Sequence, residues 1–133
     1  MRQITKYVLP LVAYCLFLFY LSSLSDLSIT KFAFPDKTAH VCLYMILGFL
    51  VARSSHLLLG QRADAHNIVA FSVLFCAIYG VSDEIHQLYV EGRSFEYGDI
   101  IADALGGALG SIFFLLIRDI IRTGRFSWGS KFL

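Results

Sequence analysis

The sequence predicts an all-α integral membrane protein built from a bundle of four transmembrane helices. Of its 133 residues, 57% are hydrophobic and only 16% are charged. The mean hydropathy of +0.68 is too high for a soluble protein surface. Four apolar segments, at roughly 5–24, 38–58, 67–89 and 99–121, each reach the ~20 residues that a helix needs to cross a bilayer core. We therefore expect one transmembrane domain over residues 1–133, with function among the helices and short loops.

The distribution of positive charge predicts the orientation of the bundle. Cytoplasmic loops of membrane proteins are enriched in Lys and Arg. With the N-terminus in the cytoplasm, only Lys31, Lys37 and Arg93 fall on the outer side. The cytoplasmic side then holds the other Lys and Arg residues, which are Arg2, Lys6, Arg53, Arg62, Arg118, Arg122, Arg125 and Lys131. We expect both termini to be cytoplasmic.

The first span is apolar around almost its whole circumference, which is typical of a scaffold helix that faces lipid. Its basic start resembles a signal peptide, but the run is long and lacks an A-x-A cleavage site, so a retained helix is expected. Cys15, Cys42 and Cys76 each lie within an apolar run without C-x-x-C spacing. We interpret these cysteines as packing residues.

The second span opens with Asp36 and Lys37. A carboxylate at this position can cap the free backbone N–H groups of a helix, so we interpret Asp36 as an N-cap. His40 and Tyr44 follow at four-residue intervals, which places them on the same face of the helix. Capping explains Asp36 without invoking a site, whereas His40 is either a packed histidine or a functional one.

The third span becomes polar in its last two turns. Asp83 and Gln87 share one face of the helix, and Glu84 lies on the adjacent face. Each carboxylate at the centre of a lipid-facing helix costs roughly 2.5–3.5 kcal/mol on insertion scales, so we expect both acids to face the bundle interior. Arg93 follows in a short outer hairpin, where its planar donors are suited to a carboxylate or a phosphate.

The fourth span starts at Asp99, again interpreted as an N-cap, and has a second acid one turn later at Asp103. Ala102, Gly106 and Gly110 form a ridge of small residues with G-x-x-x-G spacing. Such ridges let another helix backbone approach closely. We predict that this ridge packs against the second or third span and thereby fixes where the carboxylates point.

Antiparallel spans bring these polar groups to one end of the bundle, where we predict a ligand-binding site. In this set, five acids face two fixed cations, which leaves an excess of negative charge. Three explanations are open: a bound divalent cation, protons shared between carboxylates, or ion pairing with Lys37 and Arg93 with water reaching the remaining acids. The candidate metal ligands are His40, Asp83, Asp99 and Asp103, and the candidate acid/base residues are His40 and Glu84. The predicted binding residues are Asp36, Lys37, His40, Tyr44, Asp83, Glu84, Gln87, Arg93, Asp99 and Asp103.

Two blocks of the sequence resemble the VanZ-like family. The opening D-K-x-x-H motif of the family resembles the first block, which starts at Asp36 and reads DKTAHVCLYMILGFL. The family's second signature, D-E-x-x-Q followed by G-R and a glycine-rich helix, resembles the second block, which starts at Ser82 and reads SDEIHQLYVEGRSFEYGDIIADALGGALG. Asp103 stands where Asn often appears, and Glu91 where Pro is common. The resemblance implies a small multi-pass protein of the bacterial cytoplasmic membrane. The family is named for a member that confers low-level resistance to teicoplanin.

We expect the outward polar site to bind an envelope lipid headgroup, a lipid-linked envelope intermediate or a lipoglycopeptide antibiotic. In this interpretation Lys37 and Arg93 meet an anion, and the acids organise the pocket directly or through a cation. The alternative is a metal-assisted hydrolase or transferase acting on a polyprenyl or other lipid phosphate. Cation- or proton-coupled transport ranks third, because the charges lie near one face and not at the bilayer midplane. No nucleic-acid partner is expected.

Overall fold

The computed structural model describes residues 2–24, 36–60 and 64–123. Within these ranges the chain forms α-helices and no strand, which confirms the all-α class. The helices are α1 (Arg2–Ser22), α3 (Asp36–Leu59), α4 (Ala65–Gln87) and α5 (Tyr97–Arg122). All four are long and apolar enough to cross a membrane, as predicted. Helices α3, α4 and α5 each begin two residues before the predicted start.

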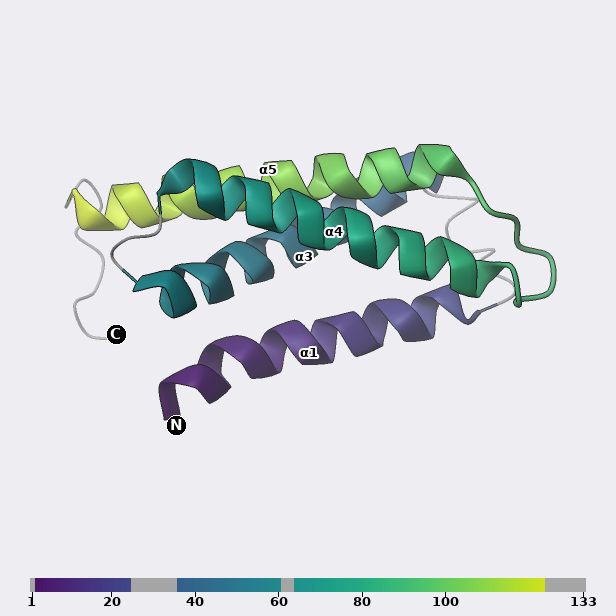
Figure 1. The fold of residues 1–133 in the computed structure, drawn as a ribbon, viewed down its shortest axis with the longest axis horizontal. Coiled ribbons are helices and arrows are strands. Elements are labelled where there is room, and N and C mark those ends of the chain that lie inside the picture. Colours follow the sequence, from purple (N-terminus) through teal and green to yellow (C-terminus); the bar gives the residue numbers. More distant parts are fainter. Residues whose placement is uncertain (1, 25–35, 61–63, 124–133) are drawn as a thin grey trace.

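The helices lie side by side as an antiparallel bundle, with α1 beginning at the end where α5 finishes (Figure 1). Helices α3 and α5 pack most extensively, α4 covers both, and α1 packs mainly on α3. We call one end of the bundle the polar end; it comprises the last two turns of α4, the first two turns of α3 and α5, and residues 88–96. The opposite end, which holds Lys6, Arg53, Arg118 and Arg122, is called the basic end.

Glycines hold α3 and α5 close together. A Cβ atom added to Gly48 of α3 would lie 2.5 Å from the carbonyl oxygen of Gly107 on α5. A Cβ on Gly106 would lie 2.6 Å from the carbonyl oxygen of Val41, and one on Gly110 would collide with the backbone of Met45. The small-residue ridge predicted on the fourth span is therefore a helix-packing surface, and its partner is the second span.

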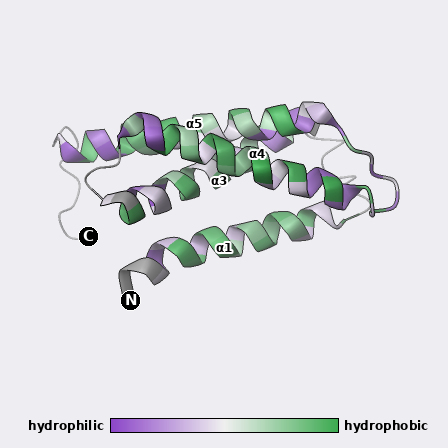
Figure 2. Ribbon diagram, in the orientation of Figure 1, coloured by the Kyte–Doolittle hydropathy of each residue, from purple (hydrophilic) through white to green (hydrophobic). Residues whose placement is uncertain are grey.

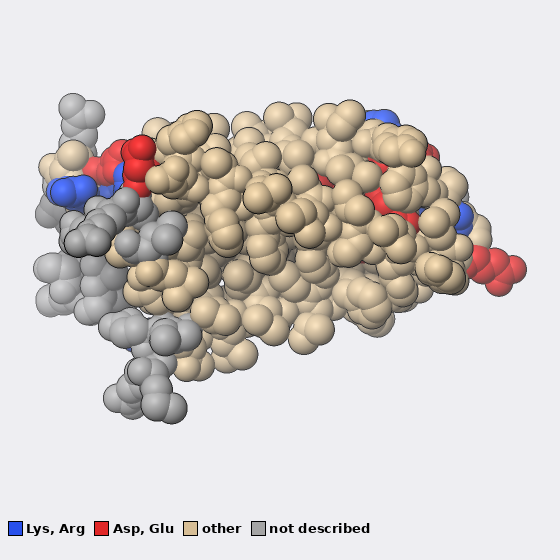
Figure 3. All heavy atoms as spheres, viewed as in Figure 1, with Lys and Arg blue, Asp and Glu red and all other residues tan. Residues whose placement is uncertain are grey.

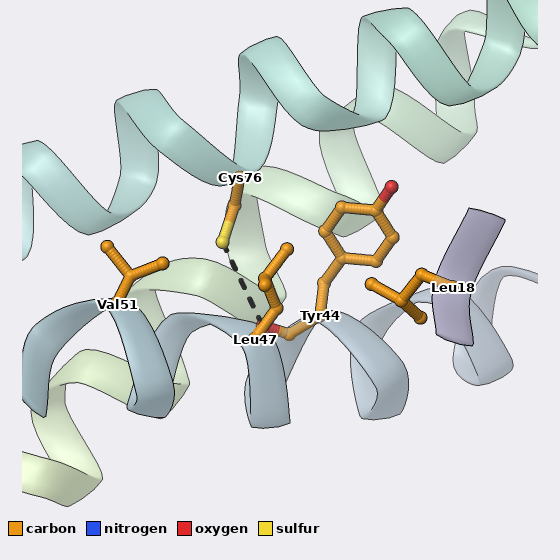
Figure 4. Packing of buried hydrophobic residues seen from close by; sticks show 5 residues of the cluster. All are labelled: Leu18, Tyr44, Leu47, Val51 and Cys76. Atoms are coloured by element: carbon orange, nitrogen blue, oxygen red, sulfur yellow. Dashed lines mark hydrogen bonds between the residues drawn. The ribbon is translucent and has the colours of Figure 1, made fainter. Parts of the chain in front are cut away.

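The apolar core is small and lies among α1, α3 and α4. Figure 4 shows Leu18 beside Tyr44, and Cys76 beside Leu47, with Val51 further along α3. Cys76 is buried, as expected for a packing residue, whereas Cys42 is exposed on the outside of α3. A tightly packed centre of this kind fixes the rotation of α3 and α4 about their axes and so determines which side chains meet at the polar end.

Large apolar side chains are exposed along all four helices, including Leu16, Phe71, Ile101 and Leu116. Figure 2 shows apolar residues along the middle of the helices and hydrophilic residues towards their ends. On the face drawn in Figure 3, charged residues gather at the two ends of the bundle and leave the central part uncharged. This pattern fits helices whose flanks contact hydrocarbon.

Helix α1 lies at the edge of the bundle. Only 11% of its candidate span is buried, against 39% of the span in α3, as expected for a lipid-facing scaffold helix. Three hydroxyl groups tie it down by donating to backbone carbonyls: Tyr14 to Leu43, Tyr79 to Cys15 and Ser54 to Tyr7, at 3.0, 2.6 and 3.0 Å. Two of these carbonyls belong to α1 itself.

Candidate functional site

The polar end contains a group of buried side chains from three helices. None of them is more than 8% exposed. Helix α3 supplies one, the last two turns of α4 supply three, and the first two turns of α5 supply two: His40, Asp83, Glu84, Gln87, Asp99 and Asp103. Buried ionisable groups are stable only when they are paired, hydrogen-bonded or neutralised, so the contacts of each one define what the site can do.

His40 connects α3 to both acids of α5. Its Nδ1 atom donates to Asp103 Oδ1 at 2.9 Å, and its Nε2 atom lies 3.8 Å from Asp99 Oδ2. The ring of Tyr44, one turn further along α3, is roughly parallel to the imidazole, with 6.2 Å between the ring centroids. Because the carboxylate of Asp103 accepts the Nδ1 proton, Nε2 is the imidazole atom that is directed to Asp99.

Asp103 fits between the helices because α4 has a glycine opposite it. A Cβ atom added to Gly80 would collide with Oδ2 of Asp103. The Asp103 side chain is completely buried, and this second oxygen has no hydrogen-bond partner among the described residues. The absence of a side chain at Gly80 therefore makes room for a carboxylate between α4 and α5.

Lys37 and Glu96 form the exposed rim of the site. The Lys37 ammonium lies 2.9 Å from Glu96 Oε2 and 3.2 Å from Asp99 Oδ1. The side chains of Lys37 and Glu96 are 56% and 48% exposed, whereas that of Asp99 is 3% exposed. The hydrogen bond and the charge of Lys37 hold the pKa of Glu96 below its ordinary value. Lys37 thus links the exposed rim residue Glu96 to the buried carboxylate of Asp99.

Glu84 is the most enclosed acid of α4. Its side chain is fully buried, and Oε2 accepts the backbone N–H of Glu96 at 2.7 Å. Its other oxygen, Oε1, has no hydrogen-bond partner among the described residues. The N-cap position of α5 is taken by Glu96, and Asp99 lies in the first turn. The prediction that Asp99 caps this helix was wrong, because its carboxylate contacts Lys37 and His40 instead.

Arg93 folds back from the connection between α4 and α5. Its Nε and Nη2 atoms both donate to Oε1 of Gln87, at 3.1 and 2.8 Å. The sharp turn before it uses Gly92, which has a φ of 79° that side-chain-bearing residues rarely adopt. The guanidinium, which the sequence indicated as suited to a carboxylate or a phosphate, here contacts a neutral amide, so Arg93 orders Gln87.

A family model described as VanZ/LLP1 matches residues 7–118, which include every element of this site. The chain belongs to the VanZ/LLP1 family. This confirms the resemblance carried by the two sequence blocks, and with the four apolar helices it identifies a multi-pass membrane protein. No curated protein and no solved structure matches the chain.

The remaining predicted residues of the VanZ/LLP1 site lie around the buried group. Asp36 begins α3, and its side chain is outside the described part of the structure. Tyr44 is buried in the core, and its hydroxyl group has no hydrogen-bond partner among the described residues. Asp83 is buried on α4, next to Glu84 in the sequence. Tyr44 thus lies beside His40 on the side of the site that faces the core.

Sequence reasoning left Glu96 out of the site, although the residue uses both its side chain and its backbone there. Its side chain pairs with Lys37, and its N–H donates to Glu84. The sequence carries no capping signal for it, because Glu is not a preferred N-cap residue and Glu96 makes no side-chain capping bond in the structure.

The donors that could hold a metal ion in this VanZ/LLP1 chain differ from the predicted set. One donor atom each from His40, Glu84 and Asp99 lie within 4.8 Å of one another. The predicted set shared His40 and Asp99 but contained Asp83 and Asp103 in place of Glu84. In the structure Asp103 instead holds the opposite side of the His40 ring.

Proposed function

We propose that this VanZ/LLP1 protein binds the polar headgroup of an envelope amphiphile, either a lipid or a lipid-linked compound, at the polar end of the bundle. The observation that supports this most directly is the layered arrangement of charge. His40 and four carboxylates are buried below, while Lys37 and Glu96 are about half exposed above. Apolar side chains cover the flanks of the same helices. An amphiphile matches both surfaces, since its headgroup can reach the charged rim while its acyl chains lie along the apolar flanks of the helices.

The depth of the site supports a headgroup ligand. Asp103 lies six residues after the start of α5 at Tyr97. At 1.5 Å per residue the deepest charged group is about 9 Å from the end of that helix, where headgroups and acyl chains meet. Coupled transport is disfavoured by the same depth, because transporter sites lie near the bilayer midplane.

The charge asymmetry between the two ends supports an outward-facing site in the bacterial cytoplasmic membrane. Lys6, Arg53, Arg118 and Arg122 lie at the basic end, whereas Lys37 and Arg93 lie at the polar end. The positive-inside tendency then assigns the basic end to the cytoplasm, together with both termini. A site with this orientation faces the compartment in which envelope polymers are built.

Lipoglycopeptide antibiotics are amphiphiles that reach the outer face, so the proposal includes them as ligands. A contribution to low-level teicoplanin resistance would follow if the site holds the antibiotic away from its target. Family membership is the support for this part of the proposal. The polar end itself supports the broader class, an amphiphile with a charged headgroup.

The second candidate is a metal-assisted hydrolase or transferase that acts on a polyprenyl or other lipid phosphate. The observation that favours it is the bond between His40 and Asp103, because a carboxylate that fixes one nitrogen of a histidine prepares the other for acid/base work. Its test is release of phosphate from a polyprenyl pyrophosphate in detergent. Release that disappears in His40→Gln would favour this enzyme, and an unchanged substrate would count against it.

The experiment that tests headgroup binding is native mass spectrometry of the purified full chain in mild detergent. We expect a co-purified amphiphile on the parent protein and less of it on Lys37→Met, which removes the rim cation. The matched control is Asp119→Asn, which alters an exposed ion pair with Arg118 at the basic end. A parent protein with no adduct, or an equal adduct on all three proteins, would reject the proposal.

A further inference from the structure

The donor atoms at the centre of the site come from three different helices. Nε2 of His40 on α3 lies 3.8 Å from Oδ2 of Asp99 on α5. Glu84 on α4 contributes the third donor, and the three donor atoms are mutually within 4.8 Å. Two ligands of one metal ion are at most about 4.4 Å apart when each bond is 2.0–2.2 Å long. Small side-chain movements therefore bring all three donors to a common ion.

The other polar atom of each donor residue is already held by a neighbour. Nδ1 of His40 donates to Asp103 at 2.9 Å. Oδ1 of Asp99 faces the Lys37 ammonium at 3.2 Å. Oε2 of Glu84 accepts the N–H of Glu96 at 2.7 Å. Protein metal sites use such outer contacts to orient their ligands, and a histidine fixed by a carboxylate is a common form. Nε2 of His40 and Oδ2 of Asp99 face each other at 3.8 Å, and Oε1 is the Glu84 oxygen that has no hydrogen-bond partner among the described residues.

The second oxygen of the Glu84 carboxylate supplies a further indication of a ligand. Glu84 is 0% exposed, and its Oε1 has no hydrogen-bond partner among the described residues. A buried carboxylate oxygen without a partner is costly. The nearby ammonium of Lys37 is engaged with Asp99 and Glu96. A cation between Glu84, Asp99 and His40 would satisfy this oxygen and offset the acidic excess of the buried layer.

We infer that His40, Glu84 and Asp99 bind one divalent transition-metal ion, with Zn²⁺ and Mn²⁺ as the best-suited species. One imidazole nitrogen with two carboxylate oxygens is a donor set for these ions, whereas Mg²⁺ and Ca²⁺ prefer oxygen donors alone. Three protein ligands leave at least one coordination position open. A phosphate oxygen is a suitable occupant, so the ion would give the site its affinity for phosphate-bearing headgroups.

This inference rests on the proposed function only for the identity of that last ligand. Metal binding itself needs no lipid, so the two proposals are tested separately. The first measurement is titration of the full chain, purified in detergent with a chelator and freed of it, with Zn²⁺ and with Mn²⁺ by isothermal calorimetry. We expect one ion per chain, and an increase in the thermal unfolding temperature when the ion is added.

Three variants test whether the ion binds at the proposed residues. Glu84→Gln keeps the shape of the side chain and should abolish stoichiometric binding. Asp103→Asn, which changes a residue that contacts the ligand His40 and is not itself a ligand, should weaken binding by roughly 10- to 100-fold. Glu91→Gln removes a negative charge from an exposed residue at the same end and should bind as the parent does. The unfolding temperature of each metal-free variant establishes that it is folded.

Two results would overturn the inference. One is the absence of stoichiometric Zn²⁺ or Mn²⁺ binding by the parent chain, and the other is parent-like binding by folded Glu84→Gln. Amphiphile binding is then compared with and without the ion by native mass spectrometry. An adduct that is equal in both cases would refute the metal's role in headgroup binding while supporting the proposed function. Metal binding without any adduct would support the metal site and reject the headgroup.

Discussion

His40 on α3 and Asp103 on α5 share a buried hydrogen bond of 2.9 Å across 63 positions of sequence. The bond joins the two helices that pack most extensively and sets the rotation of the imidazole. Its location between packed helices makes it both a structural link and the element that orients the site. These two roles lead to separate measurements.

A double-mutant cycle on His40→Gln and Asp103→Asn should give a coupling energy of about 1.5–3 kcal/mol in the free energy of unfolding, the range for a hydrogen bond to a charged group. Reversible unfolding in mixed detergent micelles provides the measurement. Changes that add to within about 0.5 kcal/mol would contradict a direct interaction between the two side chains.

Gly48→Ala should destabilise the bundle by about 1–3 kcal/mol, because the added methyl group overlaps the Gly107 backbone and pushes α3 away from α5. Gly98→Ala is the matched control. A Cβ at Gly98 would meet only the flexible end of the Lys37 side chain, at 2.9 Å, so a smaller change is expected. Equal effects of the two substitutions on the unfolding free energy would refute close packing at Gly48.

The pH dependence of the rim follows from the Lys37–Glu96 pair. Lys37 holds the pKa of Glu96 below its ordinary value of 4.5. A group whose pKa is depressed by folding adds stability above its unfolded pKa and loses it as the pH falls through the folded value. We expect a ¹³C NMR titration of Glu96 to show a higher pKa in Lys37→Met than in the parent. The same pKa in both proteins would show that the pair does not form in solution.

The orientation of the bundle can be measured by cysteine labelling in intact cells. Gly92 lies in the connection between α4 and α5, but its φ of 79° makes a cysteine there strained, so the exposed Ser94 is the better position. In a chain whose native cysteines are replaced by alanine, Ser94→Cys should react with a membrane-impermeant thiol reagent. Thr123→Cys, beyond the last turn of α5, should react only after permeabilisation. The reverse pattern would place the polar end in the cytoplasm.

The fold could be predicted because the length of an apolar run decides whether a helix spans a membrane. Helix starts were placed two residues late in three cases. At the fourth span, Asp99 was assigned as the cap because the helix was expected to start there, yet Tyr97 and Gly98 form part of the first turn. Capping signals in a sequence do not reveal that a carboxylate has a stronger partner on another helix, as Asp99 has in Lys37.

Most residues of the site could be predicted from the sequence, but the contacts among their side chains could not. Helical periodicity places Asp83 and Glu84 on adjacent faces, and both faces are compatible with an interior position. Which of the two completes the three-donor group depends on the rotation of α4 against α5, and that rotation is set by packing at positions such as Gly80 and Gly107. The turn that directs Arg93 to Gln87 likewise depends on the backbone at Gly92.

The contacts that attach α1 tolerate amino-acid substitutions that the packing surface between α3 and α5 does not. Tyr79 and Ser54 hold α1 through the carbonyl oxygens of Cys15 and Tyr7, which any residue at those positions would supply. The seam between α3 and α5 depends instead on glycines, where every other residue adds atoms that have no room. Apart from Leu18, which packs in the core, and Tyr14, which donates to Leu43, the surface of α1 can therefore change to suit bilayers of different composition. The three-helix unit that holds the site can stay unaltered while it does so.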